Sequence, residues 1–129
     1  MKLDVNDMCF ACGKNNPIGL KLAFRFEGEE YVTEFEVRPE YQGWTGLVHG
    51  GLLATVLDEV MARMLWEKDI SAITGRLSVR YHKPVSAGDK LQVRGRLTKH
   101  RPPVIETSAE AVNSEGVVVA EATAVSMEV

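Results

Sequence analysis

The residues best suited to chemistry lie within GLVHGGLLATVLDE, residues 46–59. His49 and two glycines precede an apolar run that contains two adjacent carboxylates, Asp58 and Glu59. Backbone N–H groups at the start of a helix are unpaired and carry a partial positive charge, and glycine lets a ligand approach them closely. A carboxylate beside an apolar wall can act as a general base or as a nucleophile. The segment therefore combines donors for a developing negative charge with a candidate base.

The spacing of these groups limits how one site can use them. Gly51 and Asp58 are seven residues apart, which corresponds to about 10 Å along a helix axis. Helical side chains lean towards the N-terminus and recover only part of that distance. One carbonyl group cannot comfortably contact both groups within a single chain. The spacing therefore predicts a composite site, with Gly51 from one subunit and Asp58 from its partner.

The two carboxylates have different local surroundings. Glu59 stands four residues before Arg63, so the two side chains are expected to pair on the helix surface. Asp58 has no such partner, and its helical neighbours Ala54 and Ala62 leave space for a second subunit. Asp58 is either a catalytic group or a structural acid bonded to a strand. His49 likewise either braces its loop through a backbone hydrogen bond or contacts substrate.

Hydrophobic periodicity predicts the elements that position these residues. Residues 50–68 lack alternation, are rich in Leu, Ala and Met, and are apolar on nearly every side, which is typical of a buried helix. Alternating patterns predict strands in 20–28, 31–39, 71–84, 90–100, 104–113 and 117–129. The expected fold is α+β, with a six-stranded antiparallel sheet wrapped around one long central helix. Residues 1–19 are expected to form an irregular N-terminal segment.

Composition narrows the class of protein. A length of 129 residues suits one domain, and a net charge of −3 gives no indication of nucleic-acid binding. Every apolar stretch is interrupted well before the ~18 residues that a membrane span needs. The N-terminal residues include two acids and no apolar signal core, so a cytoplasmic protein is expected.

The two cysteines, Cys9 and Cys12, form a single C-x-x-C pair. Structural zinc usually needs four ligands, and the chain has no second pair. The residues after Cys12 are typical of a turn, which does not suit a thioredoxin-like redox motif. The sequence favours a loop with no bound metal, and zinc shared between subunits or redox chemistry are the alternatives.

The motifs VHGGxxATxxDE, CFACGKNNPIGL (9–20), GWTGLVHGG (43–51) and TGRLSVRYHKP (74–84) resemble the hotdog-fold acyl-CoA thioesterases. Within that family the chain is most similar to the phenylacetic-acid-pathway type. The resemblance implies hydrolysis of acyl-CoA by a homodimer, or by a tetramer of paired dimers, with water and without a metal or cofactor.

The resemblance also implies residue roles. Asp58 matches the catalytic aspartate, Gly51 the glycine whose N–H faces the thioester carbonyl, and Thr74 a residue that positions the water or the aspartate. His49 is the remaining catalytic candidate. Some relatives have an asparagine at the position of Gly43, for which the neighbouring Gln42 is a candidate substitute. Implied substrate-binding residues are Gln42, Gly43, Gly50, Arg76, Tyr81, His82, Lys83, His100 and Arg101.

Other interpretations remain open. A non-catalytic acyl-CoA-binding or sensing dimer is possible on the same fold, although such a protein needs no base. A metalloprotein that uses His49, Asp58 and the cysteines is disfavoured by the spacing, and the Asp–His helix motif of related hydratases is not found. The predicted wall of the acyl pocket is Met61, Met64, Leu65 and Trp66, which would admit an aromatic or a medium aliphatic chain.

Overall fold

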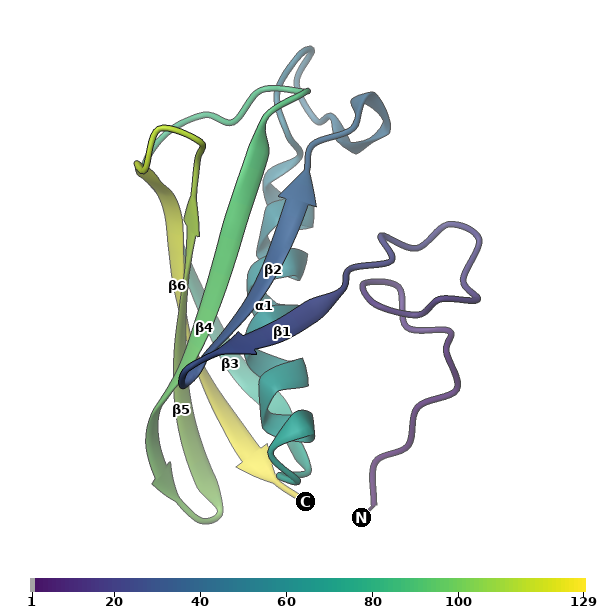
Figure 1. Cartoon of the computed structure of the whole chain (residues 1–129). Coiled ribbons are helices and arrows are strands. Elements are labelled where there is room, and N and C mark those ends of the chain that lie inside the picture. Colours follow the sequence, from purple (N-terminus) through teal and green to yellow (C-terminus); the bar gives the residue numbers. More distant parts are fainter. Residues whose placement is uncertain (1) are drawn as a thin grey trace.

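A computed structural model of the protein describes residues 2–129 and consists of an antiparallel sheet, one long helix and a short 3-10 helix (Figure 1). The strand order is β1-β2-β4-β5-β6-β3, so β1 and β3 form the two edges. The predicted α+β architecture is confirmed. The elements are β1 (Phe24–Glu27), β2 (Glu30–Glu36), η1 (Pro39–Tyr41), α1 (Gly50–Glu67), β3 (Ala72–Tyr81), β4 (Lys90–Arg101), β5 (Val104–Val112) and β6 (Val118–Glu128).

The helix α1 packs along the inner face of the curved sheet, which explains why it is apolar on so many sides (Figure 1). Strand alternation supplies the facing side chains, such as Leu91 and Val93 on β4. The predicted pocket wall is wrong for the described chain, because its first three members belong to the core. Met61, Met64 and Leu65 are fully buried against the sheet. Within residues 2–129, no helix is long and apolar enough to cross a bilayer.

The N-terminal part of the first predicted strand is not in the sheet. Lys21 has a left-handed backbone, with φ of 54°, which interrupts an extended strand. The N–H groups of Leu20 and Leu22 donate instead to the carbonyls of Phe10 and Ala11. Residues 20–23 therefore bind the N-terminal segment, and β1 begins only at Phe24.

Edge strand β3 has one side without a partner in the described chain, residues 2–129. It is ten residues long and pairs with β6 alone. Its register shifts between Thr74 and Arg76, which places a bulge at Gly75. Ile73, Leu77 and Tyr81 are exposed apolar side chains on this strand. A long edge with exposed apolar residues is a template for strand pairing with another chain.

Candidate active site

The start of α1 is built from His49, the two glycines and the end of β3. The Gly51 N–H donates to Nδ1 of His49 at 3.0 Å, which makes His49 the N-cap of the helix. The N–H groups of Leu52 and Leu53 donate to the His49 carbonyl. The remaining N–H group of the helix start, that of Gly50, has no acceptor within residues 2–129. Of the two roles considered for His49, this contact supports the brace, and it occupies the Gly51 N–H in this conformation.

A cavity of about 670 Å³ opens over this helix start, lined by Trp44, His49, Gly50, Gly51 and Tyr81 among others. A smaller hollow of about 220 Å³ shares Trp44, Val48, Gly50 and Tyr81 with it and extends to Lys83 and Pro84. The Tyr81 hydroxyl donates to the Gly50 carbonyl at 2.6 Å, and burial raises the pKa of this phenol. The glycines keep the floor of the cavity free of side chains.

The loop before α1 is braced by Gln42. Its amide oxygen accepts from the Gly46 N–H, and its amide nitrogen donates to the Pro39 carbonyl. Both ends of the amide are therefore used, and the suggestion that Gln42 positions a water is not supported in this conformation. Gly43 lies against His49, where a Cβ would come within 3.1 Å of the His49 Cα.

Asp58 is a partly buried residue of α1 and is not among the core side chains of that helix. The hydroxyl of Thr74 donates to the Asp58 carboxylate at 3.0 Å. Thr74 directly precedes the bulge in β3. The extra residue of the bulge places the Thr74 side chain on the face of the sheet that is turned towards the helix. The four predicted catalytic residues therefore form two pairs in the described chain. Thr74 contacts Asp58, and Gly51 contacts His49 at the helix start.

The two halves of the predicted site stay apart within one chain. Tyr81 contacts Gly50 at the helix start, and Thr74 contacts the Asp58 carboxylate. These two β3 residues are seven positions apart. Seven strand residues span about 23 Å. The chain therefore does not bring the helix start and Asp58 to one point, as the spacing in the sequence predicts.

The predicted coenzyme A contacts also divide between the two ends of the sheet. His82 and Lys83 follow Tyr81 at the helix-start end, and His82 faces Glu121 at 3.6 Å. His100 contacts Glu128 at 3.1 Å, and Glu128 pairs with Ala72 at the opposite end of β3. Neighbouring Arg101 lies at the same end, while Arg76 is exposed near the middle of β3. One subunit alone does not gather these basic groups.

Glu59 forms a contact that the sequence did not predict. Its Oε1 atom accepts from the Cys12 thiol at 3.2 Å and lies 3.8 Å from the Cys9 sulfur. The predicted Glu59–Arg63 pair is wrong, because the Arg63 guanidinium contacts Glu67 at 3.4 Å and covers the Trp66 ring. No local pattern indicates this cluster, since Cys12 and Glu59 are 47 residues apart.

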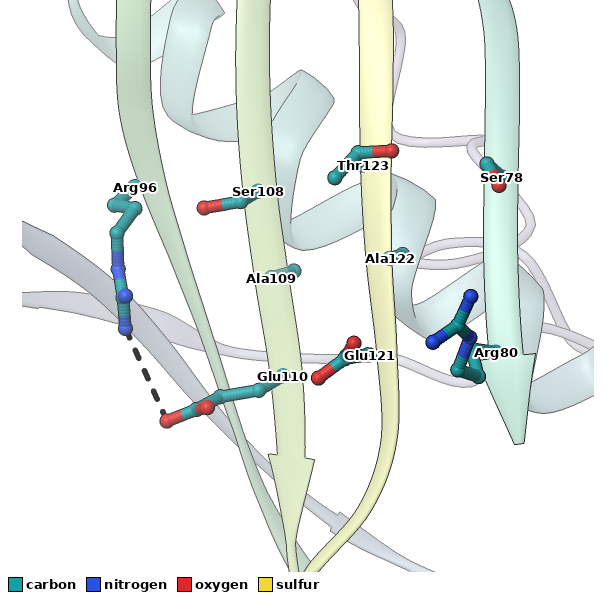
Figure 2. Close-up of a pocket in the computed structure, with 9 residues that line it drawn as sticks. All are labelled: Ser78, Arg80, Arg96, Ser108, Ala109, Glu110, Glu121, Ala122 and Thr123. Carbon is teal, nitrogen blue, oxygen red and sulfur yellow. Dashed lines mark ion pairs between the residues drawn. The ribbon is translucent and has the colours of Figure 1, made fainter. Parts of the chain in front are cut away.

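A separate hollow of about 380 Å³ lies on the outer face of the sheet, across β3, β4, β5 and β6 (Figure 2). The polar side chains of Ser108 and Glu110, which line it, alternate along β5 with the core residues Ala109 and Ala111, so the hollow faces away from α1. Arg96 and Glu110 lie across it at 3.8 Å. It contains none of the predicted catalytic residues, and its lining is mostly polar and charged.

Comparison with known proteins identifies the family. The family model described as "Thioesterase superfamily" matches residues 45–120, more than half of the chain. The chain belongs to the thioesterase superfamily. Acyl-coenzyme A thioesterase 13 of Mus musculus is 24% identical over 87 residues, which cover 66% of this chain and 62% of that protein. The chain thus matches less than two thirds of the length of this relative.

Solved structures of other proteins share the hotdog fold. The E. coli PaaI protein, from the phenylacetic acid degradation operon, has a TM-score of 0.79 at 19% identity, covering 85% of this chain and 80% of that one. A hypothetical thioesterase of Streptococcus pneumoniae, solved with coenzyme A, has a TM-score of 0.79 at 20% identity over 84% and 85% of the two chains. The same protein has been solved with an aspartate, and with a threonine, replaced by alanine.

Proposed function

We propose that this member of the thioesterase superfamily hydrolyses acyl-CoA to a free acid and coenzyme A. Water supplies the oxygen of the new carboxyl group, the acyl–sulfur bond breaks, and the sulfur leaves as the coenzyme A thiol. The observation that best supports the proposal is the Asp58 carboxylate held by Thr74 at the open edge of the sheet. A base or nucleophile fixed by a hydroxyl is the kind of group that thioester hydrolysis requires.

The helix start is the proposed oxyanion site. The Gly50 N–H is free among the described residues and opens to the cavity, and the Gly51 N–H becomes available if the His49 ring turns away. Donors directed at a developing negative charge can contribute ~3–4 kcal/mol to the transition state. The positive end of the α1 dipole acts in the same direction.

The complete site is proposed to form across a β3–β3 dimer. Antiparallel pairing about a twofold axis at Ser78, with Gly75 as the extra residue of the bulge, sets Thr74 of one subunit opposite Tyr81 of its partner. Both side chains face α1, because they bond to Asp58 and to Gly50. This pairing brings Asp58 of the partner subunit towards the helix start and covers the exposed apolar edge.

Two of the relatives support the choice of residues and substrate. In the Streptococcus pneumoniae thioesterase, the substituted aspartate and threonine have the same sequence separation as Asp58 and Thr74, 16 residues. That protein was solved with coenzyme A, and the mouse relative is named an acyl-coenzyme A thioesterase. An acyl-CoA substrate is the proposal that these names support for this chain.

The test is release of free thiol across a panel of acyl-CoA substrates, comparing wild type with Asp58→Asn. Asp69→Asn is the matched control, because Asp69 ends the helix with a φ of 61°, which asparagine tolerates well. We expect Asp58→Asn to be inactive and Asp69→Asn to retain activity. Equal rates for wild type and Asp58→Asn would contradict the assignment.

The composite site has its own test. Mixed dimers of an Asp58→Asn chain and a Gly51→Pro chain retain one intact site, so activity is expected to return on mixing. Dimer exchange is first verified with tagged subunits by size-exclusion chromatography. Verified mixed dimers without activity would contradict a site shared between subunits.

A non-catalytic acyl-CoA-binding dimer is the second candidate. The observation that favours it is the bond between the Gly51 N–H and His49, which occupies a donor that catalysis needs. This candidate predicts saturable acyl-CoA binding without thiol release, whereas the thioesterase predicts both.

A further inference from the structure

We propose that Cys9, Cys12 and Glu59 form a binding site for a divalent cation of borderline softness, such as Zn²⁺. The three donor atoms come from the N-terminal segment and from α1, and they lie within 4.8 Å of one another. Thiolate and carboxylate are ligand types that zinc accepts together. The site is separate from the proposed thioesterase site, and the proposal does not depend on that function.

The two sulfur–oxygen distances are close to those around a tetrahedral zinc ion. With Zn–S bonds of ~2.3 Å and Zn–O bonds of ~2.0–2.2 Å, a tetrahedral site separates sulfur from oxygen by about 3.6 Å. The Glu59 Oε1 atom is 3.2 Å from the Cys12 sulfur and 3.8 Å from the Cys9 sulfur. The three ligands therefore need only small shifts to surround an ion, with a fourth position left for water.

The turn between the cysteines is shaped for two sulfurs on one side. The Cys12 N–H donates to the Cys9 sulfur at 3.4 Å, which holds that sulfur against the turn. The Gly13 N–H donates to the Cys9 carbonyl at 2.8 Å. A Cβ on Gly13 would lie 2.5 Å from the Cys9 nitrogen, so only glycine allows this close turn.

The distribution of charge around Glu59 also favours a bound cation. Within residues 2–129, Glu59 forms no ion pair with Lys, Arg or His, although it is partly buried. Arg63 lies 3.8 Å from the Cys12 sulfur rather than on the carboxylate. Two thiolates, one carboxylate, a divalent cation and this guanidinium add to zero net charge. Arg63 is thus placed to neutralise the excess charge of the ligand set.

Redox chemistry is the alternative for a C-x-x-C pair, and the surroundings disfavour it. Reactive thiols lie in electropositive sites that lower the thiol pKa. Here the charged group nearest to the Cys12 sulfur is the Glu59 carboxylate at 3.2 Å, and the Arg63 guanidinium lies farther away at 3.8 Å. The sequence-based expectation of no metal depended on the lack of further ligands, and Glu59 supplies a third one.

The first experiment uses the full chain, stripped with a chelator and titrated with Zn²⁺ against a competing chromophoric chelator. We expect one ion per chain, with release of protons from the thiols on binding. Glu59→Gln and Cys12→Ser are each expected to weaken binding ~100-fold or more, because loss of an outer-shell partner alone costs ~10–100-fold. Glu115→Gln, in the exposed turn between β5 and β6, is the charge-matched control and is expected to bind like wild type.

The second experiment needs no variant, so it is independent of whether the variants fold. Co²⁺ added to the stripped wild-type chain is expected to give intense tetrahedral visible bands and thiolate-to-cobalt charge-transfer absorption. Failure to bind one ion per chain, or a cobalt spectrum without thiolate charge transfer, would overturn the proposal. So would unchanged affinity in folded Glu59→Gln, or a Cys9–Cys12 disulfide in the purified protein.

Discussion

Replacing Thr74 by valine removes one hydrogen bond and almost preserves the shape of the side chain. The bond joins the Thr74 hydroxyl to the Asp58 carboxylate at 3.0 Å in a partly buried site. Hydrogen bonds to charged groups contribute about 1.5–3 kcal/mol. If Thr74 orients Asp58 for reaction, Thr74→Val should lower kcat about 10- to 150-fold, since ~1.4 kcal/mol corresponds to a factor of ten.

The assay is thiol release from the best acyl-CoA of the panel, with kcat and KM measured separately. We expect KM to be nearly unchanged and Thr74→Ser to retain most of kcat, because serine keeps the hydroxyl. Thr107→Val is the matched control on β5, where the buried Thr107 hydroxyl has no hydrogen-bond partner within residues 2–129. That control should keep kcat and raise the free energy of unfolding by about 1 kcal/mol. A kcat for Thr74→Val equal to that of wild type would refute the positioning role.

Three further predictions follow from other contacts. His49→Ala removes the helix cap and should lower the free energy of unfolding by ~1 kcal/mol in chemical denaturation, whereas an unchanged value would contradict the capping role. Leu77→Glu places a charge on the open edge of β3, so light scattering should show monomers and thiol release should be lost. A hydrogen bond from Arg94 lowers the pKa of Glu27 from its ordinary value of 4.5. The contribution of this ion pair to the free energy of unfolding is therefore present above pH 4.5 and is lost as the pH falls. The thermal midpoint of Arg94→Gln should therefore depend less on pH between 6 and 3, and an identical dependence would count against the pair.

Much of the fold follows from local periodicity in the sequence. The alternation in residues 90–100 predicts β4 with Leu91 and Val93 inward, and the structure buries both. The segment after Gly50 is apolar on nearly every side, which predicts a helix buried by partners on several sides, and the structure surrounds α1 in this way. The left-handed Lys21 was not predictable, since the cause is a contact with the N-terminal segment that no local pattern encodes.

The candidate site was predictable where one element determines the geometry. The gap between Gly51 and Asp58 follows from helical rise alone, and the structure keeps the two ends apart. Contacts between distant segments were not predictable in this way. The Gln42 amide is used within its own loop, and Glu59 turns to Cys12 rather than to Arg63. In each case the decisive neighbour is set by how loops pack, which residue spacing does not specify.

The strand order also determines how far the chain can be trimmed for expression. The superfamily match covers residues 45–120, but β2 lies between β1 and β4, well before that segment. A fragment limited to the match would lose β1, β2 and most of β6, and β6 is the only strand that pairs with β3 among residues 2–129. Such a fragment would expose the inner face of α1 and should aggregate rather than fold. The region that identifies the family is therefore smaller than the unit that can be produced, mutated or crystallised.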